Sequence, residues 1–506
     1  MGCGTRMKRT WISCVALGGL VALIACGSDD QSQNGAGPGS DGGADDAGES
    51  LSSPSGTLNW VKTIGGTISD EGRDITAVSD GFIAVGFISA EAKVDTDDPN
   101  AIRVTSAGSK GPTDYTASPD AFIAKFRNDG TVAWAKRAGG NQNDIATGVA
   151  GLDDGSSVVV GMSGGDAKFG DGESKATTVS AGGQFVARYA PDGSLVWAKP
   201  TGHGGFAPRA ARLSTDAAVV IGALGKSSLP PGEGVGISGN GFFVARYEAD
   251  GHVVWAKGVN NASAASISAF AEGGFVVGGT LQGSATFGAG EANAQTLKGS
   301  AFVARYGVDG SLLWAKAFAG DGADVLGVAA VPGGKVGIAG QFTKAITIGN
   351  TALLPATTES QSTAFVGMLD EAGNALWAKR SKSKSYDGAI ARQVAAFDDG
   401  SLAVVGEYNH EVILGEGEPG ELDVVGTPTL NGRFNTFLAR YGADGKLGWV
   451  RRGTDAERTW AVVATGTAIG WIGSFSQATA FDSKDPAQTK VTPLGGADVF
   501  VARYLR

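Results

Sequence analysis

The sequence predicts an all-β protein, a seven-bladed β-propeller of four-stranded blades, on three observations. One phrase recurs along the chain, as in FVARYAPDGSLVWAK at 185–199 and FVARYGVDGSLLWAK at 302–316. No long segment places apolar residues at the three- and four-residue spacing of an amphipathic helix. The two halves of the phrase also stand apart at the two ends of the repeat region, which indicates a ring closed by its own terminal strands.

The tryptophan of this phrase marks each repeat. Successive copies stand 58 to 74 residues apart, a period that is typical of repeat architectures. Units of this length without helical periodicity fit propeller blades, which are made of four antiparallel strands. The copies are Trp60, Trp134, Trp197, Trp255, Trp314, Trp377 and Trp449.

Each repeat reads as four short strands. Its first half is a hairpin such as VAGLDDGSSVVVG at 149–161, where two apolar stretches flank a DG turn. A loop of variable length follows, and the FVARY and LVWAK stretches form a second hairpin around another DG turn. Because the Arg of FVARY and the DG pairs recur in most copies, we expect them to serve packing and turns rather than chemistry.

The order of the half-phrases predicts how the ring closes. The last residues, FVARYLR at 500–506, are the first half of the phrase. Its second half stands at the start of the repeat region, in GTLNWVKTIGG at 56–66. We therefore expect 58–62 to complete the blade begun by 500–504, which leaves no unpaired seam in the ring.

The first 55 residues read as export and anchoring signals. A basic start at Met7-Lys8-Arg9 precedes an apolar stretch at 11–22 that is too short to span a bilayer. Leu23-Ile24-Ala25-Cys26 then closely resembles a bacterial lipobox, which implies a signal peptide at 1–25 and lipid on Cys26. The alternatives are an ordinary signal peptide with a chance cysteine and an uncleaved anchor. Gly27 after the cysteine favours the outer membrane, and the membrane face stays open.

Residues 26–55 predict a disordered tether after the lipidated cysteine. The stretch 27–55 has no aromatic residue and no Lys or Arg, so it cannot bury a core. As a flexible coil it would span roughly 30 Å. The globular domain is then expected at 56–506.

Composition excludes several classes of function. The net charge of −10 becomes −13 when the three basic residues of 1–25 are removed, which argues against nucleic-acid binding. All three cysteines lie at or before position 26, so the mature chain has no disulfide, thiol nucleophile or cysteine metal site. No fingerprint of a cofactor, metal or catalytic site stands in its required context. We therefore expect no cofactor, no metal and no catalytic residue, and a monomer.

The segments GGADVFVARY at 495–504 and DGSLLWAK at 309–316 resemble the SBBP-type β-propeller repeat of bacterial secreted proteins and lipoproteins. The resemblance covers about 56–506. It implies the propeller fold, and it implies little about activity, because that repeat occurs in proteins of mostly unknown role.

Two sets of residues are candidates for a site. Acidic residues stand near the first strand of several blades and could ring the mouth of the central channel, or simply cap turns beside it; they are Asp74, Asp144, Asp324 and Asp387. The longest insertions, 89–121 and 407–436, belong to blades that the ring would make neighbours. They offer the candidate partner-binding residues Arg103, Tyr115, Tyr408, Arg433 and Phe434.

Two hypotheses of function remain at this stage. The first is a lipid-anchored, non-catalytic scaffold that binds a protein or a polysaccharide through its loops. The second is a propeller enzyme, a polysaccharide lyase or hydrolase, with a site at the channel mouth. The unique residues form no recognised catalytic set, which favours the scaffold.

Overall fold

The computed structural model describes residues 56–180, 182–202, 207–225, 237, 239–320, 322–355, 361–383, 388–426, 434–481 and 489–506. The predicted signal peptide, Cys26 and the tether lie outside this part. The regular elements of the described part are all β-strands, which confirms the all-β prediction. It contains no apolar helix of membrane-spanning length.

Most strands pair in antiparallel groups of four, in chain order, and each group is named here after its first strand. The groups are β2 (Glu71–Val78), β3 (Gly81–Ile88), β6 (Asp120–Arg127), β7 (Val132–Gly139); β8 (Asp144–Gly151), β9 (Ser157–Ser163), β12 (Gly183–Tyr189), β13 (Leu195–Gly202); β14 (Arg209–Arg212), β15 (Ala218–Leu224), β16 (Gly241–Tyr247), β17 (Val253–Asn260); β18 (Ala262–Ala269), β19 (Phe275–Leu281), β22 (Ala301–Tyr306), β23 (Leu312–Gly320); and β24 (Ala323–Val331), β25 (Lys335–Phe342), β28 (Thr363–Leu369), β29 (Ala375–Arg380).

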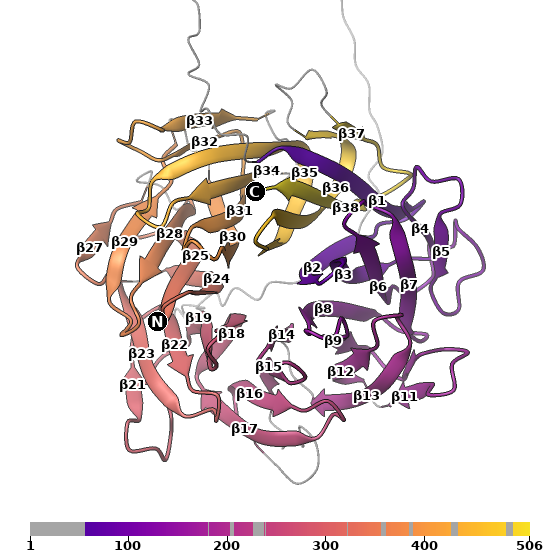
Figure 1. The fold of residues 1–506 in the computed structure, drawn as a ribbon, viewed down its shortest axis with the longest axis horizontal. Helices are drawn as coiled ribbons and strands as arrows, with labels where there is room; N and C mark the ends of the chain where they lie inside the picture. The colour runs from indigo at the N-terminus through magenta and orange to yellow at the C-terminus, as the bar shows by residue number, and fades with distance from the viewer. Residues whose placement is uncertain are drawn as a thin grey trace, which may run out of the picture. The chain divides into compact units, whose positions relative to one another are not determined.

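Two further groups share one long strand. β30 (Ala389–Ala396), β31 (Leu402–Tyr408) and β34 (Asn435–Tyr441) pair with the first part of β35 (Leu447–Ala464). The second part of β35 pairs with β36 (Ala468–Phe481), β36 with β38 (Asp498–Leu505), and β38 with β1 (Leu58–Gly66). Figure 1 shows the groups following one another around a common centre, with indigo β1 beside the yellow strands.

Short hairpins occupy most of the variable loops. They are β4 (Glu91–Val94) with β5 (Ile102–Thr105), β10 (Ala167–Phe169) with β11 (Thr177–Val179), β20 (Ala285–Phe287) with β21 (Gln295–Leu297), β26 (Ile346–Ile348) with β27 (Thr351–Leu353), and β32 (Glu411–Leu414) with β33 (Leu422–Val425). β4, β10 and β26 each pair with the outer strand of the preceding group, and β37 (Thr489–Val491) pairs with β36. These loops therefore cover strand edges that would otherwise stay unpaired.

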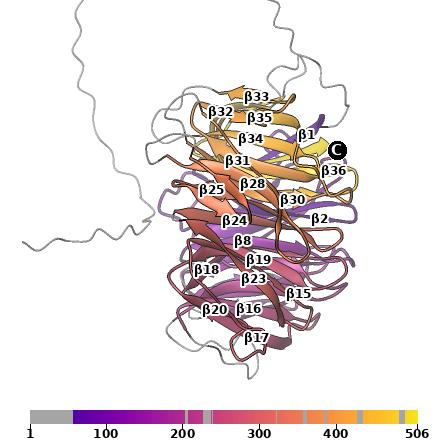
Figure 2. The same cartoon turned by 90° about the vertical axis from the view of Figure 1, so that its left-hand side faces the viewer.

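The hydrophobic core lies between successive groups, not within one of them. One buried cluster joins Val366 of β28 to Val404 of β31, and the turned view shows these sheets face to face (Figure 2). Another joins Phe122 of β6 to Ile472 of β36 and Val501 of β38. The first and last groups of the chain thus bury apolar surface against each other, which removes it from water.

The repeated tryptophan of each outer strand packs beneath the DG turn of the next group. Gly193 in one such turn has a φ of +83°, and an added Cβ would lie 2.6 Å from the Trp134 ring. Only glycine meets both demands, a positive φ and a close ring. Indole N–H groups also donate to turn carbonyls: Trp60 to Asn128 (3.0 Å), Trp134 to Pro191 (2.9 Å), Trp197 to Ala249 (2.8 Å), Trp314 to Glu371 (2.7 Å) and Trp377 to Ala443 (3.0 Å).

Gly56 occupies the same place against Trp449, although no DG turn precedes it. Its φ is +89°, and an added Cβ would lie 2.9 Å from the Trp449 ring. Its N–H donates to the Leu505 carbonyl at 2.8 Å, as the Gly193 N–H donates to the Ala190 carbonyl at 2.9 Å. Gly56 and the end of β38 thus have the geometry of a DG turn, although the two segments are not consecutive in the chain.

In the β2, β8 and β30 groups, the basic residue of the FVARY-type strand holds the first turn of its own group. Its partners are the turn carboxylates, in the ion pairs Lys125–Asp80 (2.7 Å), Arg188–Asp154 (2.8 Å) and Arg440–Asp399 (3.0 Å). These contacts confirm the structural role expected for the repeated residues. Each partly exposed pair contributes at most about 1 kcal/mol to stability.

Candidate functional site

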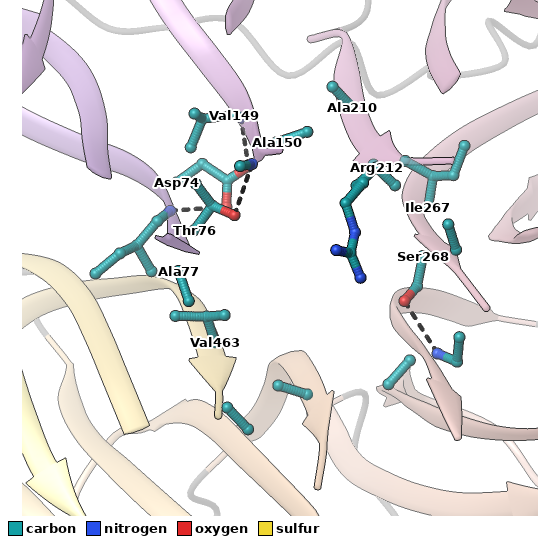
Figure 3. Close-up of a pocket in the computed structure, with 18 of the residues that line it drawn as sticks. Asp74, Thr76, Ala77, Val149, Ala150, Ala210, Arg212, Ile267, Ser268 and Val463 are labelled. Atoms are coloured by element: carbon teal, nitrogen blue, oxygen red, sulfur yellow. Dashed lines mark hydrogen bonds between the residues drawn. The ribbon is translucent and has the colours of Figure 1, made fainter. Parts of the chain in front are cut away.

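The candidate site is a cavity at the centre of the described repeats. Its volume is about 460 Å³, and it is lined by β2, β8, β14, β18, β24, β30 and β35. Figure 3 shows side chains from these strands facing the open space. Each group contributes its innermost strand, so differences between repeats decide the chemistry of the cavity.

One position of these strands can be compared between the groups. In most groups this residue directly follows a β-bulge in the first strand. It is paired with a residue in the middle of the second strand, so the register of each group identifies it. We call it the ring position, and it is held by Asp74, Gly148, Arg209, Ser266, Gly327, Gln393 and Ala461. Its polar members Asp74, Arg209, Ser266 and Gln393 line the cavity.

Asp74 is a carboxylate held by backbone donors. It accepts hydrogen bonds from the N–H groups of Ile75 (2.9 Å) and of Val149 on the next group (3.0 Å), as drawn in Figure 3. Burial raises the pKa of Asp74 to about 6, although the Arg209 guanidinium and both N–H donors oppose the rise. Burial lowers the pKa of Arg209, and Asp74 opposes that change.

Ser266 and Gln393 form a neutral pair at the ring positions of the β18 and β30 groups. The Ser266 hydroxyl accepts the Val328 N–H at 3.1 Å and lies 3.5 Å from Gln393 Oε1. Gln393 Oε1 also accepts the Val394 N–H at 3.0 Å. These contacts link the β18, β24 and β30 groups by hydrogen bonds without charge.

Each pair is separated by one group, and the ring position of that group is a glycine. Gly148 lies between Asp74 and Arg209, and Gly327 lies between Ser266 and Gln393. A Cβ on Gly148 would lie 3.0 Å from Arg209 Cα, and a Cβ on Gly327 would lie 2.5 Å from Gln393 Oε1. Any larger side chain there would displace its neighbour. The ring therefore has a charged half, with Asp74 and Arg209, and a neutral half, with Ser266 and Gln393.

The rest of the cavity offers little reactive chemistry. Arg212, which reaches into the space in Figure 3, forms an ion pair with Asp153. Asp74 and Asp153 are the acidic residues among the lining residues, and most others are Ala, Val or Ile. Among the described residues, no group of three or more His, Cys, Asp or Glu could hold a metal ion.

The predicted acidic ring is not formed by the residues proposed for it. Asp74 lines the cavity, whereas Asp144 and Asp324 do not. Asp144 lies four residues before its ring position and Asp324 three before its own, so the three carboxylates occupy different heights. Asp324 accepts from the Gln341 amide at 2.9 Å. Asp387 lies outside the described residues.

The predicted binding loops also differ from expectation. The 89–121 insertion attaches to β1, and the 407–436 insertion bridges to Lys382 beyond β29, so the β30 group separates their attachment points. Neighbouring insertions were expected, but they belong to the β2 and β30 groups, and the group of β36, β38 and β1 lies between these two.

The residues of these loops have different surroundings. Tyr408 is fully buried with its ring 6.3 Å from Phe437, so it is not available to a partner. Arg103 pairs with Glu91 across its hairpin, and Phe434 lies beneath the Arg458 guanidinium at 5.6 Å. Tyr115 is 76 % exposed, as a binding residue would be. Arg433 lies outside the described residues.

Sequence reasoning missed the other polar residues of the cavity. Arg209, Ser266 and Gln393 carry no motif, and only alignment of the first strands through their bulges would have placed them beside Asp74. The signal was the variation at this one repeat position, where Asp, Arg, Ser and Gln stand in some groups and Gly or Ala in the others.

Comparisons with known proteins show similarity at the level of structure. No family model matches the chain, and no curated protein matches it. A protein of unknown function from Bacteroides caccae is 14 % identical, with 65 % of this chain and 89 % of that chain covered and a TM-score of 0.33.

Two other solved structures are similar in the same way. The Neurospora crassa Pan2 WD40 domain is 9 % identical, with 87 % of this chain and 89 % of that chain covered and a TM-score of 0.38. A Lactobacillus plantarum protein is 11 % identical, with 77 % and 96 % covered and a TM-score of 0.40. The radial groups of antiparallel strands give this chain a fold of the β-propeller type.

Proposed function

We propose that this chain is a lipid-anchored extracytoplasmic lipoprotein whose closed, seven-bladed β-propeller is a non-catalytic scaffold for a protein partner. The seven groups are its blades, and the pairing of β1 with β38 supports closure by the two terminal strands. The lipobox-like segment ending at Cys26 supports the anchor, and the lack of basic residues in 27–55 supports a tether. The outer membrane is its proposed location.

The observation that carries the scaffold proposal is an apolar strip on three successive outer strands. The residue before the repeated tryptophan is Val254 on β17, Leu313 on β23 and Leu376 on β29, exposed by 47 %, 50 % and 51 %. The same position is Ala133 on β7 and Val196 on β13, both half-buried, and Asn59 on β1 and Gly448 on β35. Packing within a blade does not require large apolar side chains at this position on β17, β23 and β29, because the position faces solvent there.

A cavity beside β17 gives this strip an anchor point. Its volume is about 340 Å³, and Trp255, Phe275 and Tyr306 are among its lining residues. Within the described part of the chain, the buried Trp255 indole N–H has no hydrogen-bond partner. Protein interfaces characteristically seat an aromatic or aliphatic side chain in such a pocket. β17 is also an edge strand, so its backbone can pair with an extended segment of a partner.

The enzyme alternative has no comparable support. A glycosidase of the usual type needs two facing carboxyl groups. In the central cavity Asp74 accepts two backbone N–H groups, and Asp153 is paired with Arg212. No specific observation favours a lyase or hydrolase, so the scaffold is the conclusion we draw.

Site-specific photo-crosslinking tests the scaffold proposal. A photoreactive phenylalanine analogue is placed at Leu313 or Val254 of the full chain in its own cells. We expect one discrete protein adduct from each position, because both residues belong to the proposed docking strip. The matched control is Asn59, the same repeat position on β1, which should give no such adduct.

Two further arms test the anchor and the kind of partner. A Cys26→Ser variant should leave the membrane fraction, since its lipid attachment is lost. Adducts that form equally at 59 and 313 would contradict the strip, and retention of an isolated polysaccharide without any protein adduct would contradict a protein partner.

A further inference from the structure

Two junctions between successive groups contain a pair of buried aspartates. Asp120 opens β6 and Asp498 opens β38, each two residues before the Phe of its FVARY-type strand. Asp144 and Asp70 stand where the chain enters the first strand of the next group. The Asp120–Asp144 pair and the Asp70–Asp498 pair are therefore the same arrangement at two adjacent junctions.

Every carboxylate in these pairs has one oxygen without a hydrogen-bond partner among the described residues. The four side chains are at most 1 % exposed. The buried oxygens without a hydrogen-bond partner are Asp120 Oδ1, Asp144 Oδ1, Asp70 Oδ2 and Asp498 Oδ1. A buried carboxylate is costly unless it is paired, so each pair requires a compensating positive charge or a proton.

The Asp120–Asp144 pair has a positive charge of its own. Arg137 Nη1 donates to Asp120 Oδ2 at 2.7 Å and to the Gly139 carbonyl at 3.3 Å. The Gly140 N–H donates to Asp144 Oδ2 at 2.7 Å. One guanidinium therefore stands beside the two carboxylates at this junction.

The Asp70–Asp498 pair lacks that guanidinium. Arg137 follows Trp134 by three residues, and the residue three after Trp60 is Thr63, which is buried and uncharged. The donors at this pair are backbone groups, Ser89 N–H to Asp70 Oδ1 at 2.7 Å and Leu494 N–H to Asp498 Oδ2 at 2.8 Å. The Gly66 N–H also lowers the pKa of both carboxyls. In the described part of the chain, no Lys or Arg forms an ion pair with either carboxylate.

We propose that the Asp70–Asp498 pair binds a hard divalent cation, Ca²⁺ by its chemistry, in the role that the Arg137 guanidinium plays at the neighbouring junction. The two oxygens without a partner are the donor type that Ca²⁺ prefers, and among the described residues no His or Cys of a softer metal site joins them. The ion neutralises the two buried charges and joins β38 to the segment entering β2. This proposal is independent of the scaffold function.

The donor set also indicates the affinity. Two carboxylates fall short of the six to eight oxygen ligands that Ca²⁺ takes, and no third acidic residue or His joins them among the described residues. Backbone carbonyls and water must complete the shell. We therefore expect a dissociation constant on the order of 10⁻⁴–10⁻³ M, the range of extracellular calcium modules.

Calcium titration of the purified full chain, freed of metal with a chelator, tests the site. Calorimetry should show one equivalent of Ca²⁺, and the melting temperature should rise by about 2 °C or more at about 10 mM Ca²⁺. Asp498→Asn and Asp70→Asn should each lose both effects. Asp144→Asn, the matched change at the neighbouring junction, should keep both.

A variant that gains a second site tests the proposal even if the loss-of-site variants fail to fold. Arg137→Thr turns the Asp120–Asp144 junction into a copy of the proposed site, so it should bind a second equivalent of Ca²⁺. Binding that survives Asp498→Asn would overturn the proposal. A second result would also overturn it: the melting temperature of the wild-type chain does not change with Ca²⁺, and Asp498→Asn raises the melting temperature in chelator. The two carboxylates would then share a proton instead of binding a cation.

Discussion

Deleting residues 500–506 is expected to lower the free energy of unfolding by more than about 5 kcal/mol. The deletion removes Phe500, Val501 and Tyr504, which are fully buried, and each such side chain contributes roughly 1.5–3 kcal/mol. It also leaves β1 and β36 without their shared neighbour β38. The loss is comparable to the whole stability of many domains, so circular dichroism should show an unfolded chain or a sharply lower melting temperature.

The control is a deletion of equal length at 36–42. That stretch, AGPGSDG, has no aromatic or large aliphatic side chain, so its removal should change the melting temperature by less than about 1 °C. Equal losses from both deletions would show that β38 does not complete a blade.

Raising the pH from 4 to 8 in the presence of a chelator is expected to destabilise the fold by several kcal/mol. Burial raises the pKa of Asp74 and of Asp120 to about 6, and burial together with the Asp120 charge raises that of Asp144 to about 7. The folded chain then holds protons that the unfolded chain has already released. Stability from these groups is complete below about pH 4 and is lost as the pH rises through 6–7.

Charged neighbours oppose this effect without reversing it. Arg209 faces Asp74 and Arg137 faces both Asp120 and Asp144, and each guanidinium lowers the pKa of the carboxyl beside it. Below pH 4 the sign changes, because hydrogen bonds from Ser401 and Arg506 hold the pKa of Asp399 near 2 against the effect of burial. We expect maximal stability near pH 4–5.

Thermal unfolding across the pH series measures this dependence. Asp144→Asn should remove about 1–3 kcal/mol of the loss between pH 4 and 8. Asp192→Asn is the control, because Asp192 is exposed and the Ser194 hydroxyl and N–H lower its pKa. Stability that rises steadily from pH 4 to 8 would contradict the raised pKa values.

The repeated phrase made the all-β fold predictable, because its apolar strands and DG turns depend only on local residues. The pairing of FVARYLR with GTLNWVK could also be predicted, since the two segments complete one phrase. The short hairpins were not predictable. Strands such as AKF at 167–169 are too short to show an alternating pattern, and they form by pairing with the preceding group.

The candidate site was less predictable, because β-bulges shift the register of the first strands. Asp74 faces the cavity only because a bulge separates it from Gly72. Asp144, four residues before its ring position, instead enters a buried pair with Asp120. Alignment of the FVARY copies on their Phe would have revealed that Asp stands two residues earlier only at 120 and 498.

A circular permutant tests whether the two terminal strands close the ring. Gly56 matches the Gly of a DG turn, and Arg506 matches Pro191, which precedes Asp192 and Gly193. One inserted Asp between Arg506 and Gly56 therefore recreates the missing turn. New ends are opened between Asp250 and Gly251, the corresponding point of another turn.

The permutant is compared with the unpermuted chain 56–506 by thermal unfolding. We expect a single cooperative transition within about 3 °C of the parent, because the break only moves from one equivalent turn to another. A permutant that loses stability as severely as the 500–506 deletion would contradict closure by β1 and β38.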